Sequence, residues 1–140
     1  MDIEELVDNL ELLEDWEERY RYLIELGRKL PPLPDDQHTE QNKVRGCMSQ
    51  VWMFPQVDDR TSPPTLHFLA DSDAHIVKGL IAVLVVVYSG KTAQEILDID
   101  IHAVFTRLGL EKHITPNRRN GFFSMVGRIQ DLARTSLASA

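Results

Sequence analysis

The stretch that decides the fold is residues 73–88, DAHIVKGLIAVLVVVY. Its second half is rich in β-branched residues, and Val83 to Val87 taken alone would suit a buried strand. The whole stretch is longer than an ordinary strand, follows the potential cap residues Asp71 and Ser72, and ends at Gly90. We therefore predict one helix over 73–88, apolar nearly all round and so placed at the centre of the fold.

Upstream of this helix, two short runs have the composition of β-strands. Residues 50–54 and 65–70 are rich in β-branched and aromatic side chains, and the polar, proline-containing segment 58–64 separates them. This order predicts a β-hairpin with a long loop. Residues 42–44 are a weaker candidate for a third strand, at the edge of the same sheet.

The N-terminal segment has the periodicity of two amphipathic helices that end near Lys29. The apolar positions that recur at helical spacing are Ile3, Leu6, Val7, Leu10, Leu13, Trp16, Tyr20, Leu23, Ile24 and Leu30. The prolines within residues 31–34 stop the second helix, so we expect residues 31–41 to form a surface connector.

After the central stretch, the chain has the pattern of three further helices. Residues 92–97 begin with Thr92, a good cap, residues 101–108 form the next helix, and a last helix starts at Thr115 and Pro116. The predicted fold class is therefore α+β, with helices packed on one face of a small antiparallel sheet of about three strands. We expect residues 1–140 to form a single domain.

Charge and cysteine content exclude several classes of protein. The chain of 140 residues has a formal net charge of −7 and no basic run, so we expect it to bind neither nucleic acid nor an anionic membrane surface. It lacks a basic signal-peptide region, and its longest apolar run is too short to span a bilayer, which predicts a cytoplasmic protein. One cysteine cannot form an internal disulfide, and the histidines show no paired spacing, so we expect no metal centre.

Cys47 is the residue whose chemistry is most informative about function. It lies between residues 42–44 and the first strong strand, which places it in a loop or at a strand edge. Lys43 and Arg45 can stabilise a thiolate there, and Gly46 allows the backbone a positive φ. Against this, a lone cysteine is most often an inert, buried and small hydrophobic side chain.

The single thiol at this position leaves three functions open. A small cysteine-dependent hydrolase would need a histidine to take the thiol proton, which His38 or His113 could supply. A structural adaptor would carry Cys47 as an incidental thiol. A carrier would exchange sulfur with another protein, because the chain has no second cysteine for dithiol chemistry of its own.

Three blocks of sequence stand out in order along the chain. They are residues 46–52 (GCMSQVW), residues 71–82 (DSDAHIVKGLIA) and residues 110–121, which contain Thr115-Pro116-Asn117-Arg118. Together with Trp16-Glu17 and residues 24–27 (IELG), they resemble the SufE family of cysteine desulfuration proteins. The resemblance spans nearly the whole chain.

The resemblance implies a SufE/NifU-like fold and a sulfur acceptor that is not itself an enzyme. Such a protein takes persulfide sulfur from a cysteine desulfurase onto one cysteine, here Cys47, and stimulates the desulfurase. It then passes the sulfur to an iron–sulfur cluster assembly scaffold. The pyridoxal phosphate belongs to the partner desulfurase, so the chain itself is expected to hold no cofactor.

The candidate site residues are of two kinds. Cys47 is the predicted sulfur carrier. The candidates for contacting the partner or stabilising the thiolate are Arg45, Gly46, Met48, Ser49, Gln50, Asp73, Arg118 and Arg119. Asp73 is also expected, with Asp71 and Ser72, to cap the central helix, and the resemblance associates Arg118 with the desulfurase interface.

Overall fold

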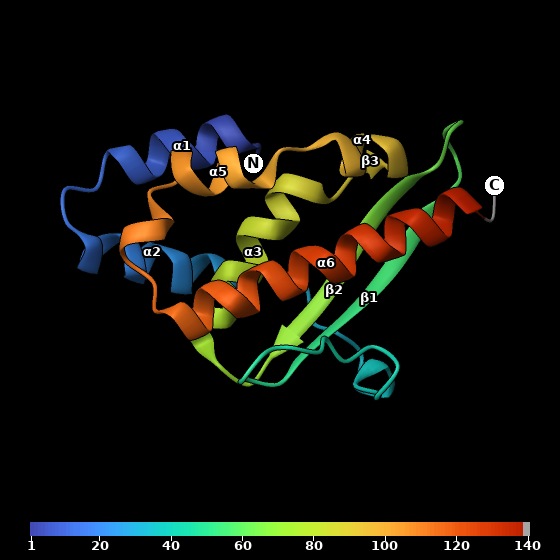
Figure 1. Ribbon diagram of the computed structural model, residues 1–140, viewed down its shortest axis with the longest axis horizontal. Coiled ribbons are helices and arrows are strands. Elements are labelled where there is room, and N and C mark those ends of the chain that lie inside the picture. The colour runs from blue at the N-terminus through green and yellow to red at the C-terminus, as the bar shows by residue number, and fades with distance from the viewer. Residues whose placement is uncertain (139–140) are drawn as a thin grey trace.

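The computed structural model describes residues 1–138 as helices arranged around a small sheet (Figure 1). The helices are α1 (Ile3–Glu11), α2 (Trp16–Arg28), α3 (His75–Tyr88), α4 (Ala93–Asp98), α5 (Ile101–Arg107) and α6 (Pro116–Ala138), with the 3₁₀ turns η1 (Asp35–Gln37) and η2 (Leu110–Lys112). The strands are β1 (Val51–Asp58), β2 (Thr65–Ser72) and β3 (Lys91–Thr92). The α+β class predicted from the sequence is confirmed.

The sheet contains the predicted hairpin but a different third strand. β1 and β2 pair antiparallel over their full lengths, from Val51 opposite Ser72, and β3 pairs with the other edge of β2. Residues 42–44 contribute only an isolated bridge to β1. β3 forms because the chain turns back at the end of α3, where the Gly90 N–H donates to Leu66 O at 2.7 Å. Two residues are too short a run to predict as a strand.

Helix α3 occupies the centre of the fold, as the length of its apolar stretch predicts. Its β-branched half is helical, and Val83 and Leu84 are almost completely buried. α3 packs on β2 and most extensively on α2. Gly27 and Gly79 allow this close approach, since a Cβ at Gly27 would lie 2.6 Å from the backbone N of Gly79. Burial on all sides therefore outweighs the strand propensity of residues 83–87.

The prediction that Asp71, Ser72 and Asp73 cap α3 is wrong. The helix begins at His75, and Ala74 at the cap position offers no side-chain hydrogen bond. β2 continues as far as Ser72, so the helix starts too late for these polar residues to occupy its cap position. Their side chains are therefore available for contacts with other parts of the chain.

One face of the hairpin supplies the sheet's share of the core. The buried side chains alternate along the two strands and are Val51, Met53, Leu66, Phe68 and Ala70. This alternation is the period-two pattern of a sheet with one covered face. α3 lies on that face, and α6 in turn packs on α3 and α4.

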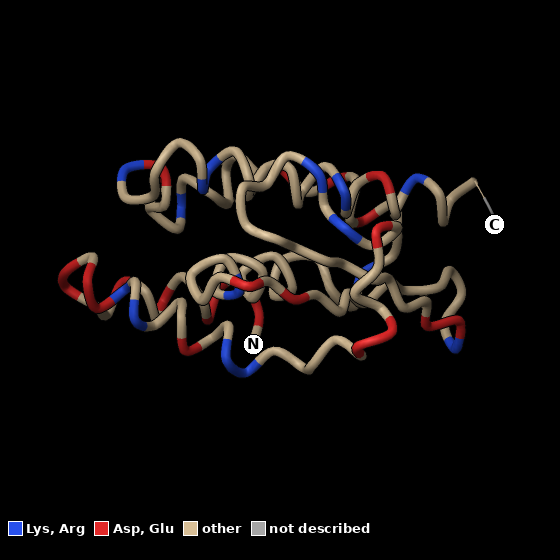
Figure 2. Tube along the Cα trace, turned by 90° about the horizontal axis from the view of Figure 1, so that it is seen from below, with Lys and Arg blue, Asp and Glu red and all other residues tan. Residues whose placement is uncertain are grey.

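The N-terminal helices α1 and α2 form where the periodicity predicts them, with Asp2 and Asp15 as N-caps. Figure 2 shows Asp and Glu concentrated in the layer that contains these helices, whereas Lys and Arg are spaced along the layer that contains α6.

Among residues 1–138, no helix is both long enough and apolar enough to cross a membrane.

Candidate functional site

Cys47 lies at the tip of the loop that connects residues 42–44 to β1. Val44 N–H donates to Val51 O at 2.8 Å, beside the isolated bridge, so the two arms of the loop are held as in a short hairpin. Gly46, directly before the cysteine, has a φ of 86°, in the left-handed region that favours glycine. We refer to residues 45–50 as the Cys47 loop.

The Cys47 loop closes one side of a pocket of about 240 Å³ whose other sides are α3 and α6. The lining residues are Cys47, Met48, Ser49, Val77, Leu80, Thr115, Asn117, Arg118, Gly121, Phe122 and Met125. Leu80, Phe122 and Met125 are almost completely buried, whereas the polar members are Ser49 in the loop and Thr115, Asn117 and Arg118 around the start of α6. The thiol is therefore next to an apolar wall and near a polar rim.

The Cys47 side chain is half-buried, and its thiol donates a weak hydrogen bond to Gly121 O at 3.5 Å. Burial raises the pKa of this thiol above its ordinary value. Lys43 and Arg45, which the sequence suggests as thiolate-stabilising residues, lie toward Glu40 in this structure, at 4.0 and 3.8 Å. Burial thus favours the neutral form of the thiol, and Arg45 stays a candidate for partner contact or for stabilising the thiolate.

The two arginines at the start of α6 are placed differently. Arg118 lines the pocket and is half-buried, whereas Arg119 is exposed and lies outside the lining. Within residues 1–138 the guanidinium of Arg118 has no hydrogen-bond or ion-pair partner. Arg118 is therefore the cation in a position to act on a group inside the pocket.

Asp73 and Gln50 fasten the far end of the Cys47 loop. The Asp73 carboxylate accepts from Gln50 N–H at 3.0 Å, and the Asp73 N–H donates to Gln50 O at 3.3 Å. Ser49 faces the pocket, while Met48 is 82% exposed. Asp73 thus positions the loop, and Met48 offers an apolar surface to a partner beside the thiol.

The histidines considered as general bases lie away from the thiol. His38 Nε2 is 2.8 Å from Asp71 Oδ2, and His113 stacks on Trp16 with ring centroids 4.5 Å apart. Neither histidine lines the Cys47 pocket. The described residues thus do not form the Cys–His pair that a hydrolase requires. They also contain no group of three or more His, Cys, Asp or Glu side chains that could hold a metal ion.

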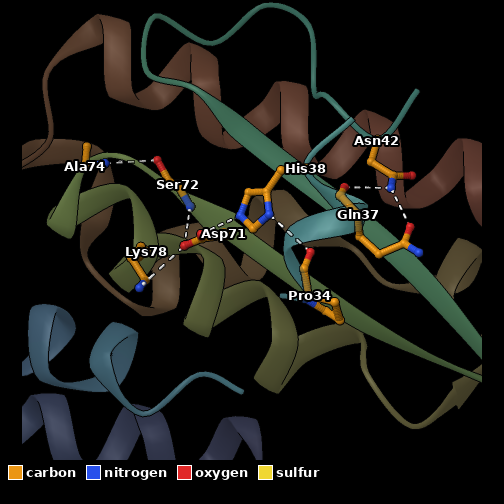
Figure 3. A network of polar contacts seen from close by, with 8 residues as sticks. All are labelled: Pro34, Gln37, His38, Asn42, Asp71, Ser72, Ala74 and Lys78. Carbon is orange, nitrogen blue, oxygen red and sulfur yellow. Dashed lines mark hydrogen bonds and ion pairs between the residues drawn. The ribbon is translucent and has the colours of Figure 1, made fainter. Parts of the chain in front are cut away.

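His38 instead belongs to a polar network that anchors the connector to β2 and α3 (Figure 3). Its Nδ1 lies 3.2 Å from Pro34 O, and Lys78 Nζ lies 3.5 Å from Asp71 Oδ1. Burial opposes ionisation of Asp71, but hydrogen bonds from His38 and the Ser72 N–H, together with the charge of Lys78, lower its pKa. The same hydrogen bond to Asp71 raises the pKa of His38. The network fixes the chain just upstream of the Cys47 loop.

Three residues of α6 that contact this region were not predicted from the sequence. Besides Gly121, they are Ser124, whose Oγ lies 3.4 Å from Gly46 O, and Arg128, whose Nη2 lies 2.9 Å from Gln41 O. Their spacing places them on one face of a helix, which the sequence does indicate. Nothing in the sequence indicates which distant segment packs on that face.

Comparisons with known proteins bear on both fold and family. A profile of the SufE family, described as an Fe-S metabolism associated domain, matches residues 4–133. Uncharacterized SufE-like proteins of Rhizobium etli and Rhizobium meliloti are each 43% identical, over 137 and 135 residues. The first alignment covers 98% of this chain and 93% of the relative, and the second covers 96% of each. The solution structure of a hypothetical protein from Thermus thermophilus has a TM-score of 0.75 at 22% identity, over 97% of this chain and 96% of that one.

Proposed function

Because the chain belongs to the SufE family, whose domain is associated with Fe–S metabolism, we propose that it is a sulfur acceptor for a cysteine desulfurase. In this proposal Cys47 receives sulfur as a persulfide and passes it to an iron–sulfur cluster assembly scaffold. The chain activates the desulfurase by removing sulfur from it and is not itself an enzyme. Pyridoxal phosphate is held by the partner, and the pair works in the reducing cytoplasm, where a free thiol persists.

The observation that carries the proposal is the place of Cys47 in the fold. It is the single cysteine of the chain, at the tip of a loop, and its half-buried thiol lines a pocket of about 240 Å³. A sulfur atom added to the thiol can extend into this space beside Leu80 and Met125. A sheltered persulfide is protected from reduction and from further oxidation.

The transfer itself is an exchange between sulfur atoms. The Cys47 thiol first loses its proton, a step that burial disfavours because it raises the pKa of the thiol. The thiolate then attacks the terminal sulfur of the persulfide on the desulfurase. A new S–S bond forms on Cys47, the S–S bond of the donor breaks, and the donor cysteine leaves as a thiolate. One S–S bond replaces another, so the step needs no oxidant.

The surface around the pocket suits a partner with apolar and acidic groups. Met48 is 82% exposed at the pocket mouth, and Arg118 has a free guanidinium within the described residues. Arg45 and Arg119 are exposed nearby in the chain. Exposed charges of one sign near a reactive group speed the approach of an oppositely charged partner and fix its orientation.

Mass spectrometry tests the proposal directly. The full chain is incubated with a cysteine desulfurase, pyridoxal phosphate and cysteine. We expect a gain of about 32 Da, one sulfur atom, that maps to Cys47, is reversed by a reductant and is absent from Cys47→Ser. A wild-type chain that gains no sulfur contradicts the proposal and favours a structural adaptor. Turnover of a simple ester or amide without an adduct contradicts it in favour of a hydrolase.

A further inference from the structure

Among the residues that the structure describes, Arg118 is the single charged residue in the lining of the Cys47 pocket. Its guanidinium has no hydrogen-bond or ion-pair partner between residues 1 and 138. The backbone N–H of Arg118 donates to Thr115 Oγ at 3.3 Å, so this cap of α6 does not use the side chain. The guanidinium is therefore free to bind an anionic group that enters the pocket.

The position of Arg118 at the start of α6 strengthens this preference for an anion. The helix spans Pro116–Ala138, and the N-terminal end of a helix carries a partial positive charge. Thr115 and Asn117 line the pocket at the same end and add a hydroxyl and an amide that can form hydrogen bonds. In the part of the chain that the structure describes, no acidic side chain of the lining opposes a negative charge here.

The other side of the pocket is apolar. Leu80, Phe122 and Met125 are at most 1% exposed, and Val77 of α3 also lines this side. A ligand that suits both sides has a short apolar part and an anionic end. A guanidinium binds a carboxylate through two parallel hydrogen bonds, so a carboxylate on a short carbon chain combines both features.

The pocket also has more space than a persulfide needs. A water molecule takes about 30 Å³ in the liquid, and one added sulfur atom is of similar size. The pocket has a volume of about 240 Å³. This is less than the roughly 300–1,000 Å³ of sites for drug-sized ligands. The remaining space therefore fits a small molecule beside the sulfur of Cys47.

We propose that the Cys47 pocket is a binding site for a small thiol that carries a carboxylate, and that Arg118 binds the carboxylate. The inference rests on the function proposed above and extends it, because the persulfide on Cys47 gains a second acceptor besides a scaffold protein. A carboxylate bound to Arg118 places the small thiol in the same pocket as the sulfur on Cys47. Arg118 thereby selects which small thiols react.

The transfer to the small thiol is again an exchange between sulfur atoms. The small thiol loses its proton to water, and its thiolate attacks the terminal sulfur of the Cys47 persulfide. A new S–S bond forms in the small molecule, and the S–S bond on Cys47 breaks. Cys47 leaves as a thiolate and takes up a proton. The product is a small persulfide, and the step consumes no oxidant or reductant.

Alkylation of Cys47 by two reagents tests the binding site without any sulfur transfer. Iodoacetate carries a carboxylate, whereas iodoacetamide carries a neutral amide of nearly the same size. Both attack the same thiolate, so the ratio of their rates cancels any effect of a substitution on the pKa or exposure of the thiol. We expect Arg118→Ala to lower the iodoacetate-to-iodoacetamide ratio about tenfold, the change expected for loss of one hydrogen bond to a charged group. Arg118→Lys keeps the charge without the planar fork and should recover part of the ratio.

Arg134→Ala is the matched control. It removes the same charge from the same helix, where Arg134 forms an exposed ion pair with Asp131 outside the pocket lining, and it should keep the wild-type ratio. An equal fall in Arg134→Ala and Arg118→Ala would overturn the proposal, since the ratio would then report net charge. A wild-type ratio in Arg118→Ala would also overturn it and leave Arg118 as a contact for a partner protein only.

A second measurement tests the class of the ligand. The full chain is loaded with sulfur from inorganic polysulfide and freed of excess reagent, and mercaptopropionate or mercaptoethanol is then added. Mass spectrometry follows the loss of the added sulfur from Cys47 and the formation of the small persulfide. We expect the mercaptopropionate-to-mercaptoethanol ratio of rates to fall about tenfold in Arg118→Ala. An unchanged ratio would overturn the proposal.

The two assays separate this proposal from the proposed function, because neither uses a desulfurase. A chain that accepts no sulfur from a desulfurase, beside ratios that fall in Arg118→Ala, would contradict the proposed function and support the small-thiol site. Normal acceptance of sulfur from a desulfurase, beside ratios that do not change, would contradict only the small-thiol site.

Discussion

The centre of α3 and the Cys47 loop are held in place by different forces. Ile81 and Val83 on α3 are completely buried, and the helix is enclosed by α2, β2 and α6. In the loop, no residue from 45 to 50 is fully buried, and its contacts with α6 are two hydrogen bonds of 3.4 and 3.5 Å. The stability of the fold and the chemistry of its thiol therefore depend on largely separate sets of residues, so we expect that one can be changed without the other.

Cys47→Ser should give the largest functional effect with almost no effect on the fold. The substitution is nearly isosteric at a half-buried loop position, so we expect a loss of about 1 kcal/mol or less in unfolding free energy. A serine hydroxyl does not ionise at neutral pH, so stimulation of the desulfurase should disappear. Alanine production by the desulfurase and thermal unfolding of the variant measure the two effects. A variant that unfolds would instead assign Cys47 a structural role.

Ile81→Ala should have the opposite effect to Cys47→Ser, because it should greatly lower stability and leave the site intact. Ile81 is completely buried on α3 and lies outside the pocket lining, so its truncation leaves a cavity in the core. We expect a loss of about 2–5 kcal/mol in unfolding free energy, measured by urea denaturation. The fraction that remains folded should accept sulfur normally. A loss below about 1 kcal/mol would mean that the core is less closely packed around α3 than burial indicates.

Arg118→Ala and Arg119→Ala compare an arginine that lines the pocket with its neighbour outside the lining. Arg118 lines the pocket and Arg119 does not, so binding of the desulfurase should weaken by up to about tenfold for Arg118→Ala and by less for Arg119→Ala. Both unfolding free energies should stay within about 0.5 kcal/mol of the wild type. Titration at low salt gives the affinities. Equal affinities for both variants and the wild type would assign the pair no role in docking.

His38 should give the smallest effect, and only on stability. Its pKa is raised by the hydrogen bond to Asp71, so folding favours the protonated form. Such a group stabilises the fold fully below its unfolded pKa, and the contribution is lost as pH rises through the folded pKa. The melting temperature of the wild type should therefore exceed that of His38→Gln most below about pH 6, and the difference should shrink as the pH rises through the raised pKa of the folded state. A difference that is independent of pH would contradict this account.

The fold was predictable where a segment carries its own signal. The helical identity of residues 75–88 follows from the length of an apolar stretch, and α1 and α2 follow from periodicity. The strand β3 was not predictable, because two residues carry no pattern and their pairing depends on the turn at Gly90. The polar residues before α3 resemble a cap locally, but β2 continues through Ser72 and removes them from that position.

The site was predictable only in part, for a similar reason. The loop, the single cysteine and the glycine before it identify Cys47 from local sequence. Its surroundings depend on contacts between distant segments, such as that of Arg128 with Gln41, which are 87 positions apart. The sequence also does not show that Lys43 and Arg45 lie toward Glu40, or that burial raises the pKa of the thiol.

The most direct test of the central claim follows labelled sulfur through a single turnover. A desulfurase is first loaded with radiolabelled persulfide from cysteine and freed of excess substrate, and the chain is then added without any reductant. Our account predicts that label leaves the desulfurase at the rate at which it arrives on Cys47, in equal amounts. Label that is released as free sulfide, or that stays on the desulfurase while Cys47 remains unlabelled, would contradict it.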